Sequence, residues 1–242
     1  MLKYLKVILL DGPIIIFSYF SWMIRFAKHP EKYPRNVRYQ KLRYLVLRVL
    51  KHFNVDIVLN DFDGFIKNSG KNRLIVCNHL SLLDPLIFIA ISPKPVTFAC
   101  KNGVKKMPII PKVVDLLEGI YLDRSDLKQQ LREMKKIEQA MVEKDGLDWC
   151  IFPEGTRNKT DERKPGQFHH GTFRCATKTK SNILIMSLFG THQVLNSRDH
   201  SKKYIVKVQV LKELSPNDYS NLTTNDIAVL AQEEVEKGLT NI

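Results

Sequence analysis

Short apolar runs, separated by longer amphipathic or polar stretches, follow one another along most of the chain. Runs of this length are typical of buried strands, and they lie at 73–77, 96–99, 119–122, 149–152 and 183–188. The stretch from Ser125 to Gly146 has apolar residues at helical spacing: Leu127, Leu131, Met134, Ile137 and Met141. The alternation of strands with helices predicts an α/β fold, with a single mixed, largely parallel sheet flanked by helices. In such sheets, functional side chains gather in the loops that follow the strands.

The first 53 residues follow a different pattern. Residues 14–24 are apolar almost throughout, but the sequence Asp11-Gly12-Pro13 separates them from an earlier apolar run. The continuous run is therefore shorter than the about 20 residues that cross a bilayer. Aromatic residues that favour a membrane interface lie within it, and basic residues flank it on both sides. We expect this segment to dip into one leaflet; the alternative is a buried core helix.

A second helix is predicted at 36–53, where apolar residues form one face and basic residues largely form another. A basic amphipathic helix suits anionic lipid headgroups, and the alternative is a solvated basic face over a core stripe. We expect residues 1–53 to form a two-helix membrane-associating motif and residues 54–242 to form the α/β domain. The protein would then be peripheral or monotopic on the cytoplasmic face of the cell membrane.

The charge of the chain indicates a polyanionic partner. There are 38 Lys and Arg against 25 Asp and Glu, which gives a formal net charge of +13. Such a charge attracts nucleic acid, an anionic membrane face or an acidic carrier protein. The sequence has no RNA- or DNA-binding signature, so we expect a membrane phospholipid surface and no nucleic acid as partner.

The four cysteines are scattered, with no Cys-x-x-Cys pair. Three lie in or beside apolar strands, so we expect buried, reduced thiols and neither disulfides nor a metal site. The adjacent His169 and His170 have no further ligands at useful spacing. The sequence also has no Walker A loop, no Gly-x-Gly-x-x-Gly and no His-Glu-x-x-His. We therefore expect no bound metal.

The loop after the strand at 73–77 has a candidate catalytic pair. His79 lies where this strand ends, and Asp84 follows five residues later, just before Pro85. Asp84 suits the N-cap of the next helix, and Pro85 suits its first position. On a regular helix this spacing would place the two side chains roughly 140° apart, but across a loop they can meet. The carboxylate would leave one imidazole nitrogen as a proton acceptor; the alternative is a strand-end histidine that only caps the loop.

Two further strands end in loops that contain an arginine. The strand at 149–152 leads into Pro153-Glu154-Gly155-Thr156-Arg157, and the strand at 119–122 leads into Asp123-Arg124. Glycine in the first loop lets the backbone approach a ligand closely. The planar guanidinium group suits a phosphate. These loops favour a site for a phosphorylated ligand; ordinary charged turns are the alternative.

The three loops together resemble the glycerolipid acyltransferase family. His79 to Asp84, Gly119 to Arg124 and Glu154 to Arg157 match its first three sequence blocks in order and separation. The resemblance covers roughly residues 70–210 and is strongest to the bacterial 1-acyl-sn-glycerol-3-phosphate acyltransferases of that family. The family's fourth block is a strand with a proline, and the matching segment 182–188 has no proline. This departure bears on donor or acyl-chain preference more than on the reaction.

The resemblance implies acyl transfer from a thioester to the free sn-2 hydroxyl of 1-acyl-sn-glycerol-3-phosphate (lysophosphatidic acid), giving phosphatidic acid. His79 would remove the hydroxyl proton, and Asp84 would orient His79 and stabilise the imidazolium. Acyl-CoA or acyl carrier protein would donate the acyl group as a substrate, with no separate cofactor. No acyl-enzyme is needed, and Ser81 would cap the loop.

The resemblance also implies a substrate site. Arg157 and Arg124 would hold the acceptor phosphate, and Glu154 would position Arg157 or the glycerol of the acceptor. Backbone amides near Gly155 would stabilise the oxyanion. The residues implied to bind substrate are Arg157, Arg124, Glu154, Gly155, Thr156 and Lys101.

Three alternative functions stay open at this point. The first is the same chemistry on glycerol-3-phosphate or another lysophospholipid. The second is a basic peripheral membrane protein without catalysis, although headgroup binding requires no carboxylate-paired histidine. The third is a hydrolase, and the absence of a Gly-x-Ser-x-Gly sequence or a metal set weighs against it.

Overall fold

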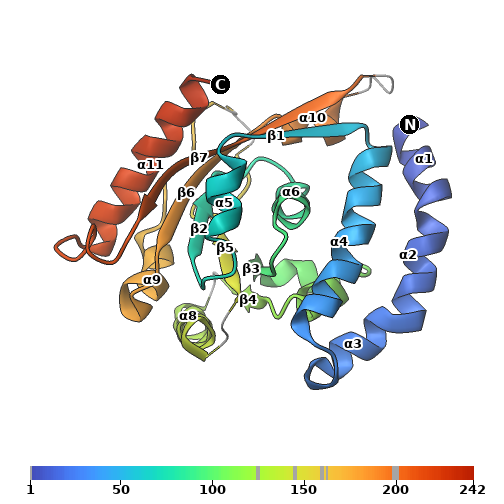
Figure 1. Cartoon of the computed structure of the whole chain (residues 1–242), viewed down its shortest axis with the longest axis horizontal. Coiled ribbons are helices and arrows are strands. Elements are labelled where there is room, and N and C mark those ends of the chain that lie inside the picture. Colours follow the sequence, from blue (N-terminus) through green and yellow to red (C-terminus); the bar gives the residue numbers. More distant parts are fainter. Residues whose placement is uncertain (1, 124–125, 144–145, 159–160, 162, 198–201) are drawn as a thin grey trace.

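A seven-stranded sheet forms the centre of the molecule, in the order β1-β7-β6-β2-β5-β3-β4. The structure is a computed structural model that describes every residue except 1, 124–125, 144–145, 159–160, 162 and 198–201. All neighbouring strands are parallel except β6 and β7, which are antiparallel. The strands are β1 (Val55–Leu59), β2 (Leu74–Cys77), β3 (Val96–Lys101), β4 (Ile120–Leu122), β5 (Asp148–Ile151), β6 (Ile183–Phe189) and β7 (Tyr204–Leu214). The predicted fold class, a mixed and largely parallel sheet flanked by helices, is therefore confirmed (Figure 1).

Helices cover both faces of the sheet and make two apolar cores. In β2, Ile75 and Cys77 face one core, and Leu74 and Val76 face the other, so all four side chains are buried. This period of two explains why a central parallel strand reads as a continuous apolar run. The first core includes side chains of α4 (Arg35–His52), α5 (Phe62–Lys67), α6 (Asp84–Ile91), α7 (Ile110–Leu116) and α10 (Thr191–Asn196). The second includes those of α8 (Leu127–Glu143), α9 (Arg174–Thr179) and α11 (Thr224–Thr240).

Some local predictions differ from the structure. The segment with Pro108 and Pro111, for which the apolar pattern indicated no element, contains the helix α7. Pro111 lies in the first turn of that helix, where its missing N–H costs nothing. In α8, Ile137 and Met141 are buried as expected, but Leu131 is 43% exposed, so the predicted buried stripe is narrower than its spacing indicated.

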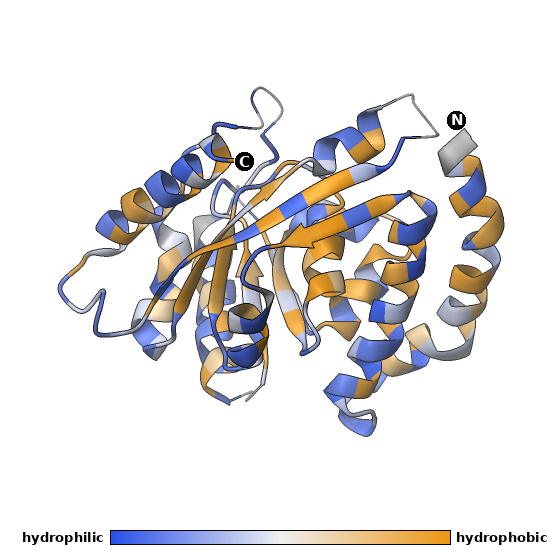
Figure 2. Ribbon diagram, turned by 45° about the horizontal axis from the view of Figure 1, so that its top comes forward, coloured by the Kyte–Doolittle hydropathy of each residue, from blue (hydrophilic) through white to orange (hydrophobic). Residues whose placement is uncertain are grey.

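The N-terminal segment forms a bent arm, which we define as residues 2–28. It consists of α1 (Leu2–Leu10), α2 (Gly12–Ser18), a π-helical turn (Tyr19–Met23) and α3 (Ile24–Lys28). The arm lies beside α4 (Figures 1 and 2). Within the described part of the chain, no single helix is long and apolar enough to cross a membrane. The two parts of the arm, which meet at an angle of 46°, reach that length and composition only when taken together.

Asp11 fastens the bend of the arm to α4. Its side chain is buried, with Oδ2 2.6 Å from His52 Nδ1 and Oδ1 3.4 Å from Arg48 Nε. A carboxylate that looks out of place in an apolar segment is thus paired inside the protein. The outward side of the arm is apolar, with large exposed side chains at Leu5, Ile8, Leu9, Ile16, Phe17 and Phe20.

Candidate active site

The sheet brings the loops that the sequence singled out to one edge. Strands β2, β5, β3 and β4 are neighbours and parallel, so the segments that follow them leave at the same edge. His79 follows β2, the segment from Phe152 to Asn158 follows β5, and Lys101 ends β3. Arg124, which follows β4, lies outside the described residues. The predicted convergence of loops at the strand ends is therefore present wherever the structure describes it.

His79 and Asp84 meet across the loop, as their spacing allowed. His79 Nδ1 lies 2.7 Å from Asp84 Oδ2. The prediction that Asp84 caps α6 was wrong, because Asp84 is the first residue of that helix and Leu83 is its N-cap. Asp84 Oδ2 instead accepts hydrogen bonds from the backbone amides of Leu80 and Ser81 at 2.7 and 2.8 Å. With Nδ1 on the carboxylate, Nε2 is the nitrogen left to accept a proton.

The other carboxylate oxygen also has a donor. Thr191 Oγ1 donates to Asp84 Oδ1 at 2.6 Å, and both side chains are fully buried. Four donors therefore hold one carboxylate and leave it little freedom to rotate. The expected loop-capping role of Ser81 is confirmed, since its Oγ accepts from the amide of Leu83 at 3.2 Å.

The loop after β5 holds His79 from the other side. The His79 ring stacks on Phe152, with centroids 4.3 Å apart and planes inclined by 15°. The His79 amide donates to Glu154 Oε1 at 2.6 Å, and its carbonyl accepts from the Asn158 amide at 2.7 Å. The ring face, the Nδ1 atom and the backbone of His79 therefore all contact neighbouring residues. The His79 side chain is 18% exposed.

Glu154 bridges two loops through backbone amides. Its Oε1 binds the His79 amide, and its Oε2 accepts from the Gly166 amide at 2.9 Å. Burial raises the pKa of Glu154, and these two hydrogen bonds oppose the rise. A Cβ at position 166 would lie 2.8 Å from Glu154 Oε2, so a larger residue there would displace this carboxylate. Glu154 was expected to position Arg157 or the glycerol, whereas its oxygens here bind the amides of His79 and Gly166.

The polar residues after β5 lie in different settings. Arg157 is partly exposed and Thr156 is exposed. Lys101 is exposed at the end of β3. Backbone amides near Gly155 were expected to stabilise the oxyanion; the amide of Gly155 itself donates to the Phe152 carbonyl at 3.0 Å.

Sequence reasoning missed three residues that support the site. Thr191 is 107 positions from Asp84, and nothing in the sequence indicates that they meet. Asn78 exchanges two hydrogen bonds of 2.8 Å with the backbone of Leu188 in β6, although its place beside His79 was a usable signal. Phe152 was assigned only to a strand, yet it provides the ring under His79.

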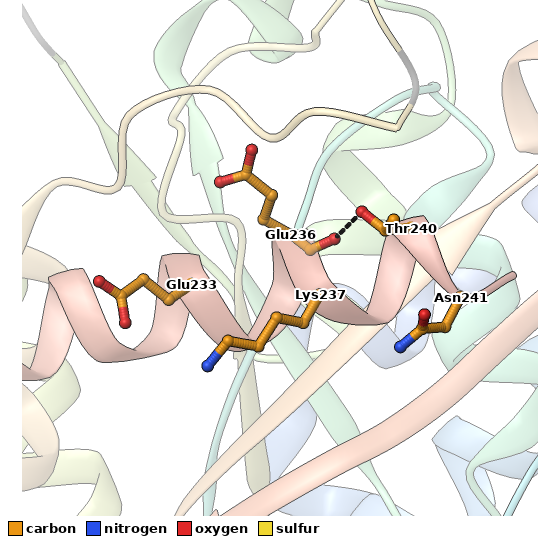
Figure 3. A pocket seen from close by; sticks show the side chains of 5 residues that line it. All are labelled: Glu233, Glu236, Lys237, Thr240 and Asn241. Carbon is orange, nitrogen blue, oxygen red and sulfur yellow. Dashed lines mark hydrogen bonds between the residues drawn. The ribbon is translucent and has the colours of Figure 1, made fainter.

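A hollow of about 290 Å³ lies elsewhere, along α11 (Figure 3). Its lining residues all belong to the end of that helix: Glu233, Glu236, Lys237, Thr240 and Asn241. None of the candidate residues is among them. The cysteines likewise offer no nucleophile at the site, because burial raises the pKa of Cys100 to about 11 and those of Cys77 and Cys150 well above the usual range.

Comparisons with known proteins identify the family of the chain. The profile of a family described as Acyltransferase matches residues 61–188. The chain is 27% identical to a probable 1-acyl-sn-glycerol-3-phosphate acyltransferase of Mycoplasma pneumoniae, over 89% of this chain and 84% of the relative. It is 30% identical to the 1-acyl-sn-glycerol-3-phosphate acyltransferase of Borreliella burgdorferi, over 57% of this chain and 53% of the relative.

The fold is also similar to that of a solved structure. The crystal structure of the 1-acyl-sn-glycerophosphate (LPA) acyltransferase PlsC from Thermotoga maritima superposes with a TM-score of 0.72. The match covers 100% of this chain and 97% of that one, at 19% identity. At this level of identity the likeness shows a shared fold, N-terminal helices included.

Proposed function

Because the chain belongs to the acyltransferase family, we propose that it transfers an acyl group from a thioester to the free sn-2 hydroxyl of 1-acyl-sn-glycerol-3-phosphate. The product is phosphatidic acid. The observation that supports this proposal best is the His79–Asp84 pair, held at the same edge of the sheet as the loop that contains Arg157. The names of relatives matched over most of the chain support the acceptor.

The pair supplies a general base. His79 Nε2 takes the proton of the sn-2 hydroxyl as its oxygen attacks the thioester carbonyl, and Asp84 stabilises the imidazolium that forms. The tetrahedral intermediate then collapses, the C–S bond breaks, and the thiolate leaves. The proton on His79 passes to that thiolate, so an ester and a free thiol are formed and the imidazole is neutral again. The enzyme forms no covalent intermediate in this sequence.

The basic residues at the same edge bind the acceptor phosphate. Arg157 and Arg124 form charge-assisted hydrogen bonds to it, and Lys101 contributes a further positive charge. A phosphate fixed in this way holds the neighbouring hydroxyl against His79 and lowers the entropic part of the barrier. Thr156 and Gly155 line the approach, while Glu154 keeps the His79 loop and the loop at Gly166 in register.

The acyl donor is a thioester of phosphopantetheine, either acyl-CoA or acyl carrier protein. A thioester is already activated towards attack by an alcohol, so base catalysis and orientation suffice, and no further cofactor enters the reaction. The positive net charge of +13 favours association with either polyanionic donor.

In this proposal the arm docks the protein on a membrane, at its cytoplasmic face. Its outward apolar side chains, of which Phe17 is 72% exposed, form a surface that suits the boundary between headgroups and acyl chains. Basic residues of the exposed side of α4, such as Lys41 and Lys51, suit anionic headgroups. Such docking would bring the acceptor, which resides in the bilayer, to the catalytic edge.

Sedimentation with anionic vesicles tests the membrane proposal. Phe17→Ser should release a large share of the protein from the vesicles, because it removes an aromatic anchor. Val142→Ser is a matched control, since Val142 is equally exposed at 70% but lies on α8. If both variants sediment like the wild type, the arm is not the docking surface.

Transfer of a labelled acyl group tests the function itself. Wild-type protein and His79→Ala are incubated with 1-acyl-sn-glycerol-3-phosphate and either acyl-CoA or acyl carrier protein thioester. We expect labelled phosphatidic acid with the wild type and none with the variant. Product from glycerol-3-phosphate or another lysophospholipid alone would correct the acceptor. Folded wild-type protein that acylates none of these acceptors would contradict the proposal and favour a non-catalytic membrane protein.

A further inference from the structure

Asp84 has one hydrogen bond that the reaction scheme above does not use. Its Oδ2 accepts from His79 Nδ1 and from two backbone amides, whereas its Oδ1 accepts from Thr191 Oγ1 at 2.6 Å. Asp84 and Thr191 are both 0% exposed, so water does not reach this bond. The Thr191 hydroxyl is therefore the one side-chain donor that holds the Oδ1 side of the carboxylate within the described structure.

The end of β6 is built to place Thr191 there. Gly190 follows β6 with φ of 91°, a conformation that L side chains rarely adopt. A Cβ at this position would lie 2.6 Å from the Ile205 carbonyl oxygen, so both the backbone angle and the space require glycine. Two residues before Gly190, the backbone amide and carbonyl of Leu188 both form hydrogen bonds with the Asn78 side chain. The end of β6 is thus tied twice to the loop that contains His79.

We propose that Thr191 is a positioning residue of the acyl transfer, which fixes the rotation of the Asp84 carboxylate and thereby the orientation of the His79 ring. This inference rests on the proposed function of the His79–Asp84 pair. A carboxylate turns about its Cβ–Cγ bond over a broad range when nothing restrains it. With Oδ1 bound to Thr191, the lone pair of Oδ2 stays directed at His79 Nδ1, and Nε2 stays directed at the acceptor hydroxyl. Without that bond, a buried oxygen is unsatisfied and the carboxylate turns towards other donors.

Thr191→Val tests the inference, because valine keeps the shape of threonine and removes only the hydroxyl. We expect kcat to fall about 10-fold or more with the Michaelis constants of both substrates within about twofold, as is typical when a partner that orients a histidine is lost. Thr191→Ser keeps a hydroxyl and should restore most of kcat.

Thr97→Val is the matched control. Thr97 in β3 is also 0% exposed, but its hydroxyl has no hydrogen-bond partner among the described residues. The same exchange of hydroxyl for methyl should therefore leave kcat unchanged. A kcat of Thr191→Val within twofold of the wild type would overturn the inference, and so would an equal loss in Thr97→Val. In either case an active wild-type protein and an inactive His79→Ala would leave the proposed function standing.

Two further measurements keep the test independent of folding and of activity. If Thr191→Val does not fold, Thr191→Cys replaces the hydroxyl with a weaker donor. Its kcat should fall between those of the wild type and His79→Ala, and a wild-type kcat would overturn the inference. A double-mutant cycle on unfolding, with Thr191→Cys and Asp84→Asn, measures the coupling of the two side chains directly. Additive effects in that cycle would contradict a bond that positions Asp84, whatever the assay shows.

Discussion

The described part of the chain contains two histidine–aspartate pairs with nearly the same distance and burial. In one, His79 Nδ1 lies 2.7 Å from Asp84; in the other, His52 Nδ1 lies 2.6 Å from Asp11. The two histidine side chains are 18% and 16% exposed, and both aspartates are buried. Distance and burial therefore do not distinguish a catalytic pair from a structural one.

The surroundings of the two pairs differ. Asp84 has four donors on its two oxygens, whereas Asp11 Oδ1 is buried without a hydrogen bond in the described structure, and the guanidinium of Arg48 is 3.4 Å away. His79 follows β2 at the edge of the sheet, where its carbonyl accepts from the amide of Asn158, whereas His52 joins α4 to the arm through Asp11. A carboxylate whose two oxygens are both bound to donors holds its histidine in one orientation, which suits the proposed catalytic role. A carboxylate that joins two helices indicates assembly.

The sharpest way to break this comparison is to remove each histidine in turn. His79→Ala should lower the rate of acyl transfer by about 100-fold or more, the usual contribution of a general base. His52→Ala should stay within about threefold of the wild type when the acceptor is dispersed in detergent, because that pair only fastens the arm. The transfer rate of each variant is measured and divided by the concentration of folded protein. Equal losses would show that the second pair also takes part in turnover.

Substitution of one arginine from each region, Arg157 and Arg48, should give an effect of intermediate size on the Michaelis constant for the acceptor. Arg157→Ala should raise the Michaelis constant for 1-acyl-sn-glycerol-3-phosphate about 10-fold, since a hydrogen bond to a charged group contributes about 1.5–3 kcal/mol. Arg48→Ala removes the same group beside Asp11 and should leave that constant unchanged. Initial rates against acceptor concentration separate the two variants. An unchanged constant in Arg157→Ala would remove this residue from the phosphate site.

The smallest expected effect is a dependence on pH. It should act in opposite directions on the rate of acyl transfer and on the stability of the fold. Burial raises the pKa of Glu154, so this carboxyl takes up a proton at a higher pH than an ordinary glutamate. A neutral carboxyl binds the His79 and Gly166 amides less strongly. The rate of acyl transfer should therefore decline as the pH falls through the raised pKa of Glu154. Because the folded-state pKa is raised, protonation of Glu154 favours the folded state, and its contribution to the unfolding free energy increases as the pH falls.

Transfer rates and circular dichroism over the same pH range check this order of events. Activity should decline severalfold while the dichroism stays constant. Loss of activity that coincides with loss of structure would show that other groups dominate the acid response.

The sequence predicted best what is local. Apolar runs located the central strands because β2 and its neighbours are buried on both faces, and the spacing of His79 and Asp84 was enough to foresee their contact. The sequence was a poorer guide to features that depend on tertiary packing, such as which side chains are covered and which distant residues meet. Leu131 is exposed despite its spacing, because packing determines which part of an amphipathic face is covered. Thr191 and the pair of His52 with Asp11 could not be found, since their partners are 107 and 41 positions away.

The ties between the His79 loop and the end of β6 have a consequence for the order in which the protein matures. Asn78 and Asp84 find their partners 110 and 107 residues later in the chain. At a translation rate of about 5–20 residues per second, those partners leave the ribosome roughly 5–20 s after the histidine does. Contacts so distant in sequence also close slowly. The arm is synthesised before these partners, so the geometry of the His79 loop forms only when most of the chain has been made.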